Sequence, residues 1–122
     1  MLTNRKTNLT MKKIILTLSA ALIIVSCAVK LVPPTQTDVD RMQSKYPGYT
    51  LEELNQGKAM FEKHCADCHR LKNPTKFSEE KWQNIVPKMV KKVNKKHPNT
   101  IDEENRDLIL KYVITMNGHP KQ

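Results

Sequence analysis

The stretch Cys65-Ala66-Asp67-Cys68-His69 decides how the rest of this sequence is interpreted. It has the Cys-x-x-Cys-His spacing of covalent haem attachment. Two thiols one helical turn apart can add to the two vinyl groups of a haem, and the imidazole that follows can supply an axial bond to the iron. The motif therefore predicts one covalently bound haem c, attached through Cys65 and Cys68 and ligated by His69.

A helix is expected to lead into this motif. Thr50 and Glu53 form a capping box, in which each side chain can bond the other residue's backbone amide. Apolar residues then recur at helical spacing, at Leu51, Leu54, Met60 and Phe61. Gly57 interrupts this face, either as a tolerated weak point or as the place where another helix approaches closely.

A second helix is expected after an extended loop. Ser78 is a good cap, and Glu79 and Glu80 suit the positive end of a helix. The predicted apolar stripe of this helix comprises Trp82, Ile85, Val86, Met89, Val90 and Val93. Pro87 should kink the helix because it lacks a backbone donor, and residues 97–99 should end it.

The last helix is expected to begin at a second capping box, Thr100 to Glu103, and to stop at Gly118. Its predicted buried face comprises Ile101, Leu108, Ile109, Tyr112, Val113 and Met116. No strand pattern and no internal repeat is visible, so the predicted fold class is all-α, a small bundle of three to four helices. A domain of about 70 residues has little core of its own, and one covalently bound haem at its centre would add apolar surface.

The N-terminal residues are typical of an exported lipoprotein. Met11, the plausible true start, opens a basic segment that precedes an apolar run over residues 14–25. The small residue before Cys27 resembles a lipoprotein cleavage box, in which the cysteine becomes the lipidated first residue. An ordinary signal peptide or an uncleaved anchor is the alternative interpretation.

These observations divide the chain into four parts. Residues 1–26 are expected to be the signal peptide, and 27–49 a lipidated N-terminus with a flexible, proline-containing tether. Residues 50–118 are expected to form the helical domain, and 119–122 a C-terminal tail.

Cysteine usage suits an exported protein in an oxidising compartment, and the charge suggests what kind of partner the protein binds. With Cys27 carrying lipid and Cys65 and Cys68 carrying haem, none of the three cysteines is left for a disulfide. Four basic residues and no acidic residue precede Cys27, so the formal charge falls from +9 to +5 for the chain from Cys27 onward. This charge favours acidic protein partners or an anionic membrane surface. Lysines interleaved with glutamates, without a nucleic-acid motif, do not predict nucleic-acid binding.

From about Gly48 to Met116 the sequence resembles a small bacterial monohaem class I cytochrome c, here in a lipoprotein-anchored form. The matching segments are residues 57–61 before the haem motif, the loop 71–74, the segment 82–89 and the closing segment 108–113. The resemblance implies a cytochrome c-like bundle in which the Pro74 carbonyl orients the haem histidine and Met89 is the sixth ligand. Pro87, two residues before Met89, departs from the family pattern and would either aim the sulfur or alter the ligand loop.

Other residues are alternative sixth ligands. Met116 is the next candidate after Met89, and His97 is the third. A Met/His pair would raise the reduction potential of the iron, and a bis-His pair would lower it. The remaining candidates are expected in other places. Met60 should lie in the core on the proximal side, His64 at the haem edge or exposed, and His119 exposed beyond the last helix. Plain core packing is the default for a methionine on an apolar helical face.

The predicted function is that of a non-enzymatic electron carrier. Lysines that could dock an acidic redox partner are Lys58, Lys63, Lys72, Lys76 and Lys88. One alternative is a haem subunit of a larger respiratory or periplasmic complex, and another is a ligand-binding or peroxidatic protein with a displaceable sixth ligand. A third discards haem and makes Cys65 and Cys68 a dithiol oxidoreductase pair, which in thioredoxin-like proteins needs a βαβ scaffold.

The expected location is a membrane surface that faces the periplasm, reached through the lipid on Cys27. Ala28 follows the cysteine where some inner-membrane lipoproteins have an aspartate, and this slightly favours the outer membrane.

Overall fold

The structure, a computed structural model, describes residues 29–119. Within that range the chain is helical and contains no strand, which confirms the predicted all-α class. The helices are α2 (Gln36–Met42), α3 (Leu51–Cys65), α4 (Glu79–Lys96) and α5 (Glu103–Asn117), with a short 3-10 helix η1 (Pro74–Lys76) in the loop between α3 and α4.

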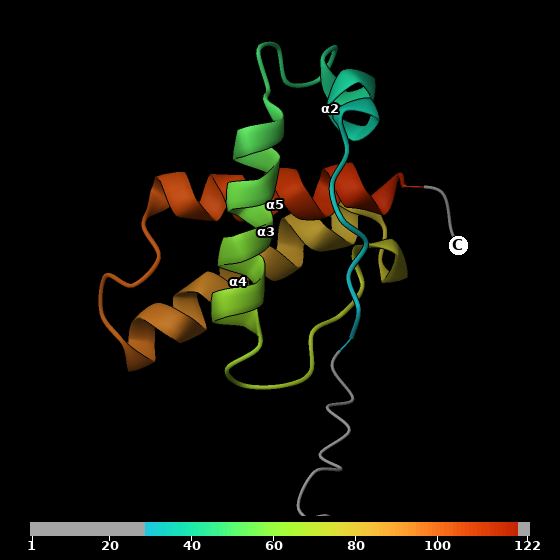
Figure 1. Ribbon diagram of the computed structural model, residues 1–122. Helices are drawn as coiled ribbons and strands as arrows, with labels where there is room; N and C mark the ends of the chain where they lie inside the picture. Colours follow the sequence, from blue (N-terminus) through green and yellow to red (C-terminus); the bar gives the residue numbers. More distant parts are fainter. Residues whose placement is uncertain (1–28, 120–122) are drawn as a thin grey trace, which may run out of the picture.

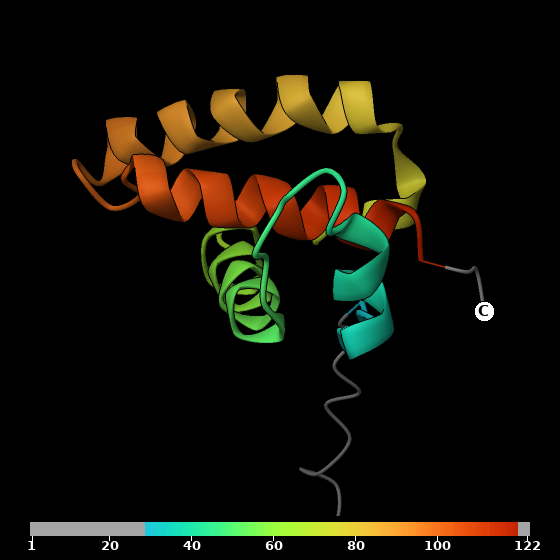
Figure 2. The ribbon, with the colours of Figure 1, turned by 90° about the horizontal axis from the view of Figure 1, so that it is seen from above.

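Helix α5 is the centre of the arrangement. Seen from above, it lies between α3 on one side and α4 on the other (Figure 2). Helix α3 crosses α5, whereas α4 runs alongside it in the opposite direction (Figure 1). Helix α2 lies near the C-terminal end of α5, on the same side as α3 (Figure 2). Each of the other helices can therefore bury its apolar face against α5.

The predicted start of α3 and its close approach to a partner helix are both present. Thr50 is the N-cap, its hydroxyl accepts from the Glu53 amide, and the Glu53 carboxylate accepts from the Thr50 amide. Gly57 is buried where α3 crosses α5, and a Cβ at this position would lie 2.8 Å from the Tyr112 Cβ. The absence of a side chain at Gly57 therefore lets the two helices approach.

An aromatic cluster joins the three long helices. The ring of Phe61 on α3 lies 6.0 Å from that of Trp82 on α4 and 5.5 Å from that of Tyr112 on α5, between centroids. Phe77, in the loop before α4, stacks edge-on at 5.3 Å from Trp82. Burial of one such ring stabilises the fold by about 1.5–3 kcal/mol, and aromatic pairing adds about 0.5–1.5 kcal/mol.

The start of α5 differs from the sequence prediction, whereas the start of α4 agrees with it. The N-cap of α5 is Asp102, whose side chain accepts from the Asn105 amide, so the predicted capping box at Thr100 is wrong. The Thr100 hydroxyl instead donates to the His97 carbonyl in the preceding turn. Helix α4 starts after the predicted cap Ser78 and runs through Pro87 to Lys96.

The structure corrects the prediction of a flexible tether over residues 27–49 for the part that it describes. Val39 of α2 is fully buried, and Leu31 and Tyr49 are 7% and 4% exposed. The proline-rich composition indicated a linker, but its few apolar side chains are spaced so that each reaches the core. A sequence signal for α2 was present, because Thr35 and Asp38 form a capping box. Cys27 and the predicted signal peptide lie outside the described residues.

Among residues 29–119, no helix is both long enough and apolar enough to cross a membrane.

Candidate functional site

A cavity of about 310 Å³ lies between the C-terminal end of α3, the loop that follows, α4 and α5. This volume is at the lower end of the range for small-molecule and cofactor sites, which are mostly apolar clefts with a few polar groups. Its lining residues are Phe61, His64, Cys65, Cys68, His69, Lys72, Phe77, Trp82, Ile85, Val86, Met89, Val90, Lys92, Val93, Ile101 and Ile109. The cavity therefore has apolar walls and its chemically reactive groups at the α3 end.

Cys65, Cys68 and His69, the residues of the predicted haem-attachment motif, all line this cavity. Cys65 is the last residue of α3 and is half-buried, whereas Cys68 and His69 follow in the next turn and are exposed. Both cysteines are free thiols. Burial raises the pKa of the Cys65 thiol to about 11, with a smaller contribution from Asp67. The Cys65 thiol is therefore neutral at physiological pH.

Met89 lies on α4 and lines the same cavity, half-buried. Among the described methionines it is the one in the cavity wall. Met116 is 3% exposed and packs in the core cluster away from the cavity, and His97 is exposed beyond the end of α4. Of the three candidate ligands, Met89 therefore lines the same cavity as the motif, and Met116 and His97 do not.

His64 and His119 occupy positions that the sequence did not predict closely. His64 is 7% exposed and lines the cavity, so of its two predicted places solvent exposure is wrong. Burial lowers its pKa, with a contribution from Lys63. The prediction that His119 is solvent-exposed is wrong, since its ring Nδ1 lies 2.8 Å from Asp38 Oδ1 and its side chain is 16% exposed.

The carbonyl of Pro74 has partners other than the one expected. It accepts from the Trp82 indole at 2.8 Å and from the Asn117 side chain at 2.9 Å. The His69 Nδ1 instead lies 2.9 Å from the Arg70 carbonyl oxygen. In this structure the Pro74 carbonyl positions Trp82 in the cavity wall, and the expected contact with His69 is replaced by these two donors.

The apolar stripe predicted for α4 serves two purposes. Trp82 and Val86 are buried in the core, as expected, and also form part of the cavity wall. Ile85, Met89, Val90 and Val93 are only half-buried, and all four line the cavity. Periodicity identifies an apolar face but does not show which of its side chains are covered by the protein and which stay half-buried at a cavity.

Lysines lie at the border of the cavity. Lys72 and Lys92 contribute to its lining, and Lys96 Nζ lies 3.5 Å from Cys68 Sγ. The second half of α4 is rich in exposed lysine and contains no acidic residue; its lysines are Lys88, Lys91, Lys92, Lys95 and Lys96. By contrast Lys58, one of the predicted docking residues, pairs with Glu62 on its own helix at 2.7 Å. Sequence reasoning had not selected four of these five α4 lysines, although their density was a signal.

Comparisons with protein-family models, with curated proteins and with solved structures found no match to this chain.

Proposed function

We propose that this chain is a c-type cytochrome that carries electrons at a membrane surface facing the periplasm. One haem c would be held covalently by Cys65 and Cys68, with His69 and Met89 as the axial ligands of its iron. The observation that carries this proposal is that all four residues, from two separate helices and the turn after α3, line one cavity.

The residues of the cavity fit such a group. Its two thiols and one imidazole lie at one end, its thioether is on α4, and its walls are apolar and aromatic. A bound haem would supply a one-electron redox centre, and a Met/His axial pair would raise its reduction potential. The half-buried side chains of Ile85, Val90 and Val93 would then gain the apolar contacts that the protein alone does not provide.

The walls of the cavity would hold the surroundings of the redox centre rigid. The Trp82 indole is held by the Pro74 carbonyl, and its ring is packed between those of Phe61 and Phe77. These contacts join α3, α4 and the intervening loop, so the residues around the site have little freedom to rearrange. Fixed surroundings favour electron transfer, which requires no movement of substrate groups.

The environment of Cys65 argues against the dithiol alternative. A dithiol oxidoreductase needs a thiolate nucleophile, and such cysteines have a lowered pKa. Burial raises the pKa of Cys65 instead. Addition of a thiol to a vinyl group, in contrast, leaves a neutral thioether that suits this half-buried, apolar place.

The lysines next to the cavity support an acidic protein as the redox partner. The α4 lysines and Lys72 would place positive charge beside the opening, which would steer a negatively charged surface toward it. Binding of this kind is transient and weakens as salt is added, because exposed charges are screened. The membrane association proposed here depends on lipidation of Cys27, outside the described residues.

The experiment that tests the proposal is an optical spectrum of the full chain, produced with haem-maturation machinery. We expect a c-type ferrous spectrum, a weak far-red methionine–iron band in the ferric form, and no change on addition of carbon monoxide. Haem should remain attached after denaturation, and the double variant Cys65→Ala/Cys68→Ala should lose it. Ready binding of carbon monoxide would indicate an open sixth position, and absence of covalent haem would contradict the proposal.

A further inference from the structure

Residues 29–49, here called the N-terminal arm, are docked on the domain along their whole length. Leu31 is buried near the start of the arm, Val39 in its middle and Tyr49 at its end. Val29 and Val32 are half-buried against the same core. The arm therefore behaves as part of the domain from its first described residue.

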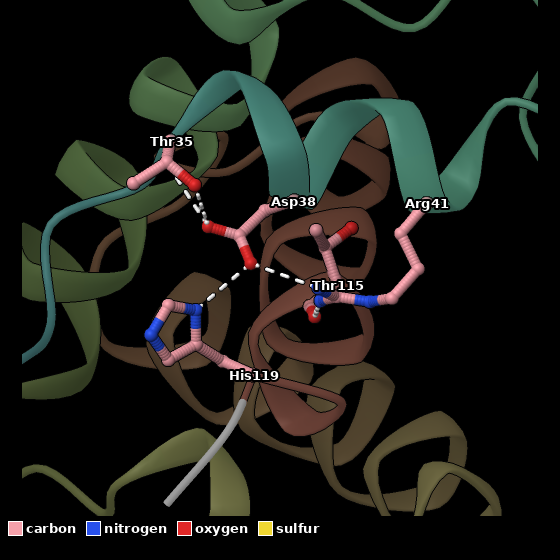
Figure 3. Close-up of polar contacts among 5 residues, drawn as sticks. All are labelled: Thr35, Asp38, Arg41, Thr115 and His119. Carbon is pink, nitrogen blue, oxygen red and sulfur yellow. Dashed lines mark hydrogen bonds and ion pairs between the residues drawn. The ribbon is translucent and has the colours of Figure 1, made fainter. Parts of the chain in front are cut away.

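A buried polar cluster fastens the arm to the C-terminal end of α5. Asp38 on α2 is 1% exposed, and one of its oxygens accepts from the amide and hydroxyl of Thr35, at 3.0 and 2.7 Å. Its other oxygen lies 3.1 Å from Arg41 Nη1 and 2.8 Å from His119 Nδ1 (Figure 3). Arg41 also donates to the Thr115 carbonyl at 2.8 Å (Figure 3). We call these five residues the Asp38 cluster.

The Asp38 cluster selects one position for the arm. A buried carboxylate is costly unless charged or polar donors satisfy it. Two contacts reach beyond the arm: His119, just after α5, lies against Asp38, and Arg41 donates to the Thr115 carbonyl at the end of α5. The bonds of Asp38 to Thr35 and Arg41 lie within the arm, whereas the contacts with His119 and the Thr115 carbonyl form only when the arm lies against the end of α5.

The docked arm shortens the connection between the domain and Cys27. Cys27 precedes Val29 by two residues, and an extended chain covers at most about 7 Å over that distance. If the arm were free, the chain from Cys27 to Thr50 would behave as a flexible linker with an end-to-end distance of about 25 Å. Docking thus removes most of the freedom that a lipidated N-terminus would otherwise give the domain.

We infer that the docked arm holds the domain directly against the lipid surface that carries Cys27. The Asp38 cluster is the clasp, meaning the set of contacts that keeps the arm docked on the end of α5. This inference rests on the lipidation included in the proposed function. Helix α4 lies on the opposite side of α5 from α2 (Figure 2), so docking of the arm leaves the exposed α4 lysines accessible to a soluble partner.

The test uses the lipidated full chain in a supported bilayer of zwitterionic phosphatidylcholine, which does not attract the lysines. Neutron reflectometry measures the water gap between headgroups and protein, and hydrogen exchange measures the protection of the arm amides. The test variants are Asp38→Ala and His119→Ala. The matched control is Asp40→Ala, an exposed aspartate of α2 whose side chain accepts only from Gln36 on the same helix.

For the wild type and Asp40→Ala we expect a gap below about 10 Å and protected amides in α2. For Asp38→Ala and His119→Ala we expect amide exchange in α2 at least about tenfold faster, and a gap that widens toward about 25 Å. His119→Ala leaves the α2 capping box intact and therefore separates loss of the clasp from loss of the helix.

Three results would overturn the inference. A wild-type arm that exchanges as fast as an unfolded peptide would show that it is not docked. A wide wild-type gap in a chain whose Cys27 carries lipid by mass spectrometry would contradict this inference alone. An unmodified Cys27 would contradict both this inference and the proposed membrane anchoring. The proposed haem attachment is tested separately, by the optical spectrum described above.

Discussion

Gly57 on α3 faces the backbone carbonyl of Leu108 on α5 so closely that a methyl group at Gly57 would overlap the carbonyl oxygen. The obstructing atoms are the backbone of α5 and the Cβ of Tyr112, neither of which is the movable end of a side chain. This crossing sets the distance between α3, which carries Cys65, and α5, which supplies one wall of the cavity. The close crossing at Gly57 therefore affects both the free energy of unfolding and the shape of the cavity.

Gly57→Ala is expected to destabilise the protein by about 1–3 kcal/mol, because the added methyl group forces the two helices apart. This outweighs the gain of up to about 1 kcal/mol from the better helix propensity of alanine. Urea unfolding followed by circular dichroism measures the change. Gln56→Ala, one position earlier on the exposed side of α3, is the control and should change stability by less than about 0.5 kcal/mol. Equal stability of Gly57→Ala and wild type would contradict the close crossing.

Met89→Ala is expected to leave haem attached and to open the sixth coordination position. The side chain lines the cavity from α4, on a separate element from the attachment motif. The ferric far-red band should disappear, and ferrous protein should bind carbon monoxide readily. Met60→Ala is the matched control, since Met60 is also half-buried but does not line the cavity. An unchanged ferric spectrum in Met89→Ala would show that Met89 is not the ligand.

The two motif thiols are expected to differ in reactivity when the full chain is produced without haem. Burial raises the pKa of Cys65 to about 11, so at pH 8 its thiol is protonated and unreactive, whereas Cys68 is exposed. Iodoacetamide should modify Cys68 first, and the rate at Cys65 should rise about tenfold per pH unit until pH approaches its pKa. Peptide mass spectrometry gives both rates. In urea the difference should vanish, and equal rates in the folded chain at pH 8 would contradict the prediction.

The stability contributed by Asp38 is expected to depend on pH in the acid range. Burial alone would raise the pKa of Asp38, but hydrogen bonds from His119, Thr35 and Arg41 outweigh it and hold the pKa below the ordinary value of 3.8. The contribution is therefore fully present above about pH 3.8 and is lost as the pH falls through the lower folded-state pKa.

Asp38→Asn tests this dependence. It should reduce the free energy of unfolding at pH 6 by about 1–3 kcal/mol, because the amide cannot accept all four hydrogen bonds. The difference between variant and wild type should shrink as the pH is lowered below 3.8. Urea unfolding at a series of pH values measures it, with Asp40→Asn as the exposed control on the same helix. A difference that stays constant down to pH 2 would contradict the assigned direction of the pKa.

Local chemistry made much of this protein predictable from sequence. The caps at Thr50 and Ser78 follow from side-chain to backbone bonds within a few residues, and the helical class follows from the spacing of apolar residues. The predicted haem-attachment motif is equally local, because the prediction rests on the spacing of Cys65, Cys68 and His69 within a single turn. The approach of another helix at Gly57 was predictable as one of two alternatives, since only a residue without a side chain permits it.

Contacts between distant residues had to come from the tertiary structure. The sequence offered Met89, Met116 and His97 as ligands, and only packing places the first in the cavity wall, the second in the core and the third in solvent. The burial that raises the pKa of Cys65 depends in the same way on helices distant in sequence.

The N-terminal arm shows the division most clearly. Composition alone made residues 27–49 a tether, whereas the bond between Asp38 and His119, 81 positions apart, makes their described part a component of the domain. The sequence by itself determined what forms within a few residues: the helical class, the caps at Thr50 and Ser78 and the close spacing of Cys65, Cys68 and His69, where a residue's partners are its close neighbours along the chain. The tertiary structure decided which side chains share the cavity and which satisfy the buried carboxylate, because a residue's burial and distant partners exist only once separate helices have packed together.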